Sequence, residues 1–151
     1  MRRDRAIPRS TVCTRIYDVD EWRNPNVVKV LSSCAGFALY FSRAPIPYRR
    51  SDGIALRGDK PGRPPKRRLW GYRHLGLYVF RRDFLFRFAR LRPTVLEQIE
   101  SLEQPRALQN GYPIYVAEVN EPSIEVDTVA DLRKAKRYLQ SGLNERKLWR
   151  R

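Results

Sequence analysis

The sequence predicts an α/β fold, because runs with the composition of strands alternate along the chain with runs that have helical spacing. Two observations carry this prediction. Several short segments are rich in β-branched and aromatic residues. In the second half of the chain, the segments between and after such runs repeat apolar residues every three or four positions. The length of 151 residues and a hydrophobic fraction of 42% suit one packed domain.

A β-hairpin is predicted near the beginning of the chain. Val27–Leu31 and Phe37–Phe41 are the two strand-like runs, and the small, turn-prone residues 32–36 join them. The segment Arg43–Arg73 follows, with five prolines, four glycines and ten of the Lys and Arg residues, and it shows no periodicity. We therefore expect a long basic loop there.

A strand over Tyr72–Phe80 and a helix over Arg81–Leu91 come next, the helix with Phe84, Leu85 and Phe88 on one side. Thr94 and Glu97 have the spacing of a capping box. They predict a single helix that begins there, runs to about Gln109 and ends at Asn110-Gly111. Leu96, Ile99 and Leu102 recur at helical spacing within it.

The last predicted elements are a strand over Tyr112–Val119, a very short strand over Ile124–Val126, and a final helix that follows Asp127-Thr128. The residues expected to form the buried stripe of that helix are Val129, Leu132, Ala135 and Leu139. Residues 144–151 form a basic tail.

Charge is the unusual bulk property of the chain. Lys and Arg total 31 against 16 acidic residues, a formal net charge of +15, which favours a polyanionic partner or an anionic substrate. Two cysteines and one histidine argue against a zinc site, and the cysteines are too few for a disulfide framework. No apolar run is long enough for a membrane helix, so we expect a reduced, cytoplasmic setting.

Few residues stand out as candidates for chemistry. Asp127 lies where a strand gives way to a helix, the position at which open α/β sheets bind ligands, and its carboxylate could hold Mg²⁺. The other interpretation is that it favours the positive end of the helix. His74 in its strand fits a structural role as well as a functional one, and Arg43 could bind a carboxylate or phosphate. The basic loop with Tyr48 and Trp70 also permits a nucleic-acid-binding protein, although no recognised motif accompanies it.

A series of blocks, in order, resembles one family. The blocks are Asn24–Val30, Gly36–Pro47, Tyr72–Tyr78, Arg82–Leu85, Leu96–Gln104, Arg106–Leu108, Val126–Thr128 and Asp131–Leu132. Together they are similar to the C-terminal, sugar-binding part of the 3-deoxy-D-manno-octulosonate (KDO) cytidylyltransferases, over about residues 11–139. The resemblance implies one partial domain, residues 1–151, with a nucleotidyltransferase-like (Rossmann-like) mixed sheet and flanking helices.

The resemblance also implies an activity. The anomeric hydroxyl of KDO would attack the α-phosphate of CTP, giving CMP-KDO for lipopolysaccharide synthesis and releasing pyrophosphate. Two aspartates of the family hold Mg²⁺, and one of them corresponds to Asp127. The family's KDO pocket corresponds to Arg43, His74, Tyr78, Glu103 and Gln104. The full-length family implies a homodimer, with no membrane segment.

The chain departs from the family pattern in three ways. It lacks the family's phosphate-gripping loop and second aspartate, Pro105 stands where the family has an apolar helix residue, and residues 49–68 have no clear match. We therefore expect a truncated form that is inactive alone, with a basic nucleic-acid-binding protein or a catalytically dead partner subunit as alternatives. Pro105 is expected to disturb the helix and displace Glu103 and Gln104.

Overall fold

The computed structural model describes residues 7–48 and 69–120, and within 129–140 it describes 129, 132–133, 135–137 and 139–140. The chain divides into two units, Met1–Asn120 and Glu121–Arg151. The first unit contains β1 (Arg9–Ile16), α1 (Val19–Arg23), β2 (Lys29–Ser32), β3 (Ala38–Ser42), β4 (Gly71–Phe80), α2 (Arg82–Ala89), α3 (Val95–Glu100), α4 (Gln104–Gln109) and β5 (Ile114–Glu118).

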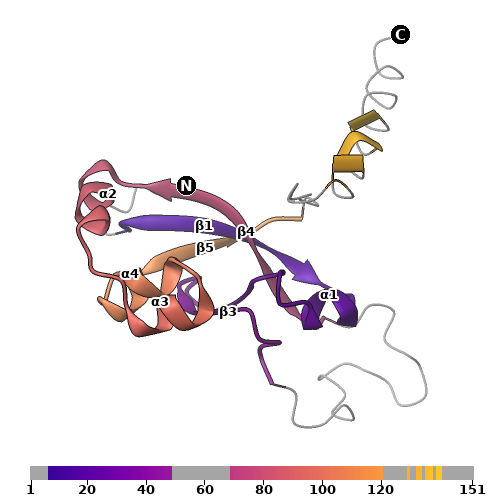
Figure 1. Ribbon diagram of the computed structural model, residues 1–151, viewed down its shortest axis with the longest axis horizontal. Helices are drawn as coiled ribbons and strands as arrows, with labels where there is room; N and C mark the ends of the chain where they lie inside the picture. Colours follow the sequence, from indigo (N-terminus) through magenta and orange to yellow (C-terminus); the bar gives the residue numbers. More distant parts are fainter. Residues whose placement is uncertain are drawn as a thin grey trace. The chain divides into compact units, whose positions relative to one another are not determined.

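The five strands form one mixed sheet in the order β3-β2-β4-β1-β5. Strand β1 runs antiparallel to β4 and parallel to β5, and β2 pairs antiparallel with both β3 and β4. Helices α2, α3 and α4 gather toward one end of the sheet, and α1 lies toward the other (Figure 1). The predicted α/β class, with a mixed sheet and flanking helices, is confirmed.

The hairpin and the long strand are confirmed, with small changes in their limits. Strands β2 and β3 pair as predicted, and Gly36 in the turn between them has a φ of 82°, a backbone conformation that glycine adopts readily. Strand β4 begins at Gly71, so the last three residues of the predicted loop belong to the sheet. Residues 49–68 of that loop lie outside the described residues.

Strand β1 was not predicted, although it lies between β4 and β5. Its buried positions include Arg9, Thr11, Cys13 and Ile16. Because two of these buried residues are polar, the strand lacks the alternation of apolar and polar residues that indicates a half-buried strand. The short helix α1 was missed as well, although the side chain of Asp18 caps it by accepting a hydrogen bond from the Asp20 backbone N–H at 2.9 Å.

The single helix predicted from Thr94 to about Gln109 is wrong, because the chain forms two short helices there. Glu97 accepts a hydrogen bond from the Thr94 backbone N–H, as a capping box requires. However, Ser101 takes a left-handed conformation with φ of 50° and ends α3. Pro105 then lies in the first turn of α4, where a proline is tolerated because the missing N–H has no intrahelical partner. The expected disturbance by Pro105 is therefore also wrong.

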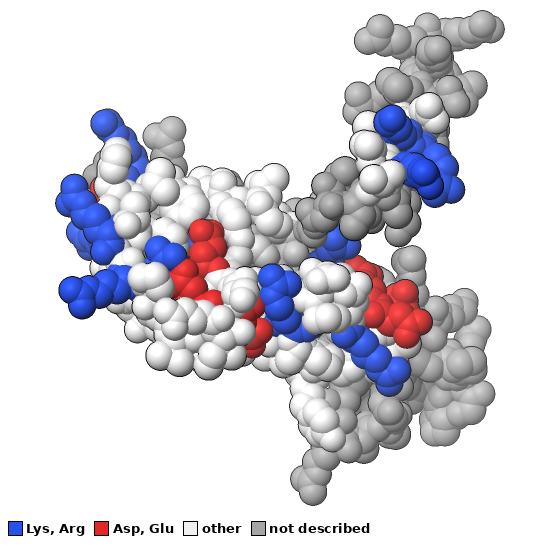
Figure 2. All heavy atoms as spheres, viewed as in Figure 1, with Lys and Arg blue, Asp and Glu red and all other residues white. Residues whose placement is uncertain are grey.

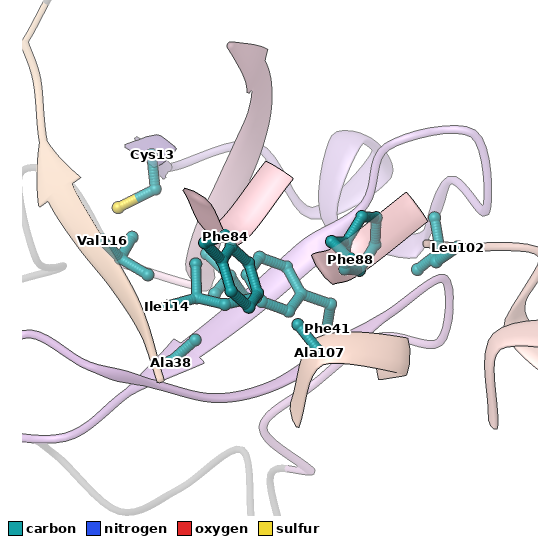
Figure 3. Packing of buried hydrophobic residues seen from close by; sticks show 10 residues of the cluster. Cys13, Ala38, Phe41, Phe84, Phe88, Leu102, Ala107, Ile114 and Val116 are labelled. Atoms are coloured by element: carbon teal, nitrogen blue, oxygen red, sulfur yellow. The ribbon is translucent and has the colours of Figure 1, made fainter. Parts of the chain in front are cut away.

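The hydrophobic core lies where α2 and α4 pack against the sheet (Figure 3). Phe84 and Phe88 of α2 are buried, but Leu85, predicted to lie with them, is 45% exposed. The prediction grouped Leu85 with Phe84 because the two are adjacent in the sequence. Consecutive helix residues point in different directions, so the side chain of Leu85 lies outside the buried face. The other core residues are Cys13, Val30, Ala38, Phe41, Leu102, Ala107, Ile114 and Val116.

In the second unit, the described residues between 129 and 140 are helical, as predicted. The predicted burial of the apolar stripe is wrong for Val129, Leu132 and Leu139, which are 68%, 43% and 63% exposed. An apolar stripe shows which face of a helix favours a partner, but it does not supply that partner. The predicted strand Ile124–Val126 and the tail 144–151 lie outside the described residues.

Candidate functional site

An irregularity in the pairing of β1 with β4 creates a polar site inside the sheet. Thr11 pairs with Tyr78 and the next residue, Val12, pairs with Leu75, so two extra residues of β4 bulge between them. The Thr11 hydroxyl lies 2.8 Å from the Leu77 carbonyl and 3.3 Å from the Leu75 carbonyl. The Thr11 side chain thus bonds to backbone carbonyl groups at the bulge, which allows a hydroxyl to be buried there.

His74 lies at this bulge and is 5% exposed. Its Nε2 is 2.8 Å from Thr11 Oγ1, and its ring packs edge-on against Phe41 at 5.1 Å and tilted against Tyr78 at 5.4 Å between centroids. Burial, and secondarily the positive charge of Arg9, lower the pKa of His74 to about 4. His74 is therefore neutral at physiological pH. Because the Leu77 carbonyl takes the Thr11 proton, this geometry favours a hydrogen on Nε2.

Arg9, on the same face of β1 as Thr11, is the charged centre of the site. Its side chain is fully buried, and Nη2 donates to Glu103 Oε1 at 2.5 Å. The guanidinium carbon lies 4.3 Å from the ring centroid of Tyr78 and 4.6 Å from that of Phe80, so aromatic faces support the cation. One buried arginine thus joins two predicted site residues, Tyr78 and Glu103.

Gln104 completes the group at the start of α4. It is 3% exposed, and its Nε2 donates to the hydroxyl of Tyr78. Burial raises the pKa of Tyr78, outweighing the opposing effect of the Arg9 cation, so the hydroxyl stays protonated. We call Arg9, Thr11, His74, Tyr78, Glu103 and Gln104 the polar cluster. It offers a cation, a carboxylate, an amide, a phenol and a neutral imidazole, the mixture that suits an acidic polyhydroxylated ligand.

Arg43 directly follows β3 and is bound to the segment that precedes Glu103. Its Nε donates to the Glu100 carbonyl at 2.9 Å, Nη1 to the Pro25 carbonyl at 3.1 Å, and Nη2 lies 3.4 Å from the Ser101 carbonyl. Within the described part of the chain, its hydrogen bonds go to these groups and to Glu100 rather than to the polar cluster. Arg43 thus holds the turn between α3 and α4 that leads to Glu103 and Gln104.

Glu100 ties the same turn to β3. Its carboxylate accepts hydrogen bonds from Ser42 Oγ at 2.6 Å, from the Arg43 backbone N–H at 2.9 Å and from the Tyr40 hydroxyl at 3.1 Å. Burial alone would raise the pKa of Glu100, but these hydrogen bonds together lower it. The ionised carboxylate therefore fixes the position of α3, and with it the approach to the polar cluster.

Four of the six predicted site residues, His74, Tyr78, Glu103 and Gln104, thus come together, and Arg43 supports them from the adjacent turn. Asp127, the predicted metal ligand, lies outside the described residues. Over the described ranges there is no group of three His, Cys, Asp or Glu side chains that could hold a metal ion. Nor does any helix in those ranges have the length and apolar character to cross a membrane.

Sequence reasoning missed Arg9 and Thr11 because both lie in the unpredicted strand β1. Arg9 is one of 31 basic residues, and nothing in the sequence separates it from those on the surface. On the face of the first unit shown in Figure 2, Lys and Arg side chains gather at the left edge, and elsewhere they lie among acidic ones. Their spacing could have indicated the burial of these residues. Arg9, Thr11 and Cys13 are two positions apart, so they lie on one face of a strand and are buried together.

Known proteins share much of the sequence of this chain. The sequence model of a family described as "Cytidylyltransferase" matches residues 5–120. A 3-deoxy-manno-octulosonate cytidylyltransferase of Syntrophotalea carbinolica is 47% identical over 137 residues, which are 91% of this chain and 53% of that protein. The corresponding protein of Geotalea uraniireducens is 47% identical over 131 residues, 87% of this chain and 51% of the relative.

A solved structure is also similar. It is a CMP:2-keto-3-deoxy-manno-octonic acid synthetase complexed with CTP, with a TM-score of 0.77 and 37% sequence identity, and the match covers 94% of this chain and 53% of that one. The chain spans about half the length of the curated relatives it matches. Since the family match covers most of the described first unit, the chain belongs to the cytidylyltransferase family.

Proposed function

We propose that this chain is the sugar-recognising part of an enzyme that transfers CMP from CTP to KDO. The observation that carries the proposal is the convergence of His74, Tyr78, Glu103 and Gln104, together with a buried cation, in one polar cluster. The printed names of the relatives and the CTP in the similar solved structure support the two substrates.

In the proposed reaction, the anomeric oxygen of KDO forms a bond to the α-phosphorus of CTP. The bond between that phosphorus and the bridging oxygen of the β-phosphate breaks, pyrophosphate leaves, and the hydroxyl proton passes to solvent. The polar cluster contributes by binding and orienting the sugar, which lowers the entropic barrier to attack. Neutral His74 adds no charge to this arrangement, and its Nε2 is engaged with the Thr11 hydroxyl.

Mg²⁺ is the cofactor we propose, with Asp127 as the ligand that this chain supplies. A carboxylate oxygen is the donor that Mg²⁺ prefers, so the residue type fits the ion. When bound, Mg²⁺ would neutralise charge that develops on the phosphates. We further propose a homodimer for the full-length enzyme and a cytoplasmic location, where CTP is available and free thiols such as those of Cys13 and Cys34 stay reduced.

A chimera tests the proposal. The N-terminal part of the Syntrophotalea carbinolica relative that lies outside the match would be joined to this chain at the matched boundary. We expect pyrophosphate release that requires CTP, KDO and Mg²⁺, whereas the 151-residue chain alone releases none. Asp127→Asn should lower turnover by orders of magnitude with little loss of stability, and Arg43→Ala should raise KM for KDO but not for CTP.

Two results would count against the proposal. A folded chimera without transfer activity would favour a catalytically dead partner subunit. Pyrophosphate release by the chain alone, above a control without enzyme and abolished by Asp127→Asn, would show that these residues suffice for catalysis.

A further inference from the structure

Arg9 has hydrogen-bonding capacity that the described part of the protein does not use. Its side chain is fully buried, and Nη2 donates to Glu103, but Nε and Nη1 have no hydrogen-bond partner among the described residues. A buried charged donor without an acceptor is unfavourable, so such groups are normally satisfied by a protein group or a ligand. The arginine is thus prepared to bind an acceptor that is absent from its surroundings.

Three aromatic rings contact the guanidinium of Arg9. Tyr78, Phe80 and Phe88 place their rings 4.3, 4.6 and 5.2 Å from the guanidinium carbon, and ring faces stabilise a cation but accept no strong hydrogen bond. The partner carboxylate of Glu103 belongs to a side chain that is 45% exposed. Glu103 can therefore move toward solvent more readily than Arg9 can.

A second unpartnered group lies in the same cluster. Gln104 is 3% exposed, and its Oε1 has no hydrogen-bond partner within the described ranges, although its Nε2 donates to the Tyr78 hydroxyl. Tyr78 connects the two groups, because its ring packs on Arg9 and its hydroxyl contacts Gln104. A ligand that carries a carboxylate close to a hydroxyl group would satisfy the donors of Arg9 and the acceptor of Gln104 together.

We propose that Arg9 binds the carboxylate of the acidic sugar, an assignment that rests on the proposed function. The sugar carboxylate replaces Glu103 on the guanidinium, and Glu103 becomes free to accept hydrogen bonds from sugar hydroxyls. The exchange keeps one carboxylate on the buried cation throughout. Arg43 is less suited to this role, because its guanidinium already donates to backbone carbonyl groups of Pro25 and Glu100.

The experiment compares two ligands across three forms of the 151-residue chain. Calorimetric titrations with KDO and with its uncharged methyl ester would be made on wild type, Arg9→Met and Arg15→Met. Arg15 is the matched control, because it lies on the same strand and pairs with Glu118 while its side chain is 47% exposed. We expect wild type and Arg15→Met to prefer KDO by about tenfold or more, the size of a hydrogen bond to a charged group, and Arg9→Met to lose this preference.

The possible failures are distinguishable. If Arg9→Met folds and keeps the preference for KDO, the carboxylate binds elsewhere, so the role of Arg9 is refuted while the proposed function stands. If wild type binds neither ligand, both are refuted. If Arg9→Met does not fold, NMR of the wild-type chain tests the role of Arg9. The Nε–H signal of Arg9 would be assigned by its loss in Arg9→Lys. It should shift saturably with KDO and not with the ester, and an unchanged signal would overturn the assignment.

Discussion

Acid should destabilise this protein through His74 well before most carboxylates titrate. The pKa of His74 is lowered from 6.5 to about 4, first by burial and second by Arg9. Between these values the unfolded chain binds a proton at His74 and the folded chain does not. The free energy of unfolding contributed by this group is therefore fully present above pH 6.5 and falls with pH, by up to about 1.4 kcal/mol per pH unit, until pH reaches about 4.

From pH 7 to pH 4.5 this linkage amounts to about 2 kcal/mol. Urea unfolding of wild type and His74→Gln at both pH values isolates the histidine, because all carboxylates are common to the two proteins. Wild type should lose about 2 kcal/mol more than the variant. The chain has one histidine, so an NMR titration reports its pKa without ambiguity. A measured pKa within half a unit of about 6.5 would refute the burial argument.

Three further predictions follow from particular residues. Cys34 is exposed and should react quickly with a thiol reagent. Cys13 is buried, and burial and Glu118 raise its pKa to about 11, so it should react only on unfolding. Equal reaction rates in the Cys34→Ser and Cys13→Ser proteins would contradict this. Pro105→Leu should not recover the ~3 kcal/mol expected on removing a proline from a helix interior, because Pro105 lies in the first turn of α4; thermal unfolding measures the difference, and a gain of that size would show a continuous helix. RNA affinity should be weak and fall steeply with salt, whereas tight, sequence-dependent binding at physiological salt would revive the nucleic-acid-binding alternative.

Elements specified by local sequence could be predicted, and those specified by distant contacts could not. The β2–β3 hairpin and β4 have the residue types that favour strands, and Glu97 marks the start of α3 through a bond to the nearby Thr94. Strand β1 was not predicted because its burial depends on a distant part of the chain. Thr11 is buried against a bulge in β4, some 60 positions away in the sequence. The break at Ser101 also depends on tertiary structure, since it brings Leu102 into the core.

The candidate site shows the same division. The resemblance to a family identified His74, Tyr78, Glu103 and Gln104, and the structure brings them together. It could not identify Arg9, whose importance comes from complete burial beside Glu103 and not from its residue type. The role of Asp127 stays a prediction, because it lies outside the described residues.

The most direct test of the central claim uses His74 as a reporter of the polar cluster. The imidazole signals of the 151-residue chain would be followed by NMR at pH 7 during separate additions of KDO and of CTP. If the cluster is the sugar site, KDO should shift these signals saturably and CTP should leave them almost unchanged, because His74 touches Thr11, Phe41 and Tyr78 at the cluster's centre. A shift with CTP and none with KDO would contradict the assignment.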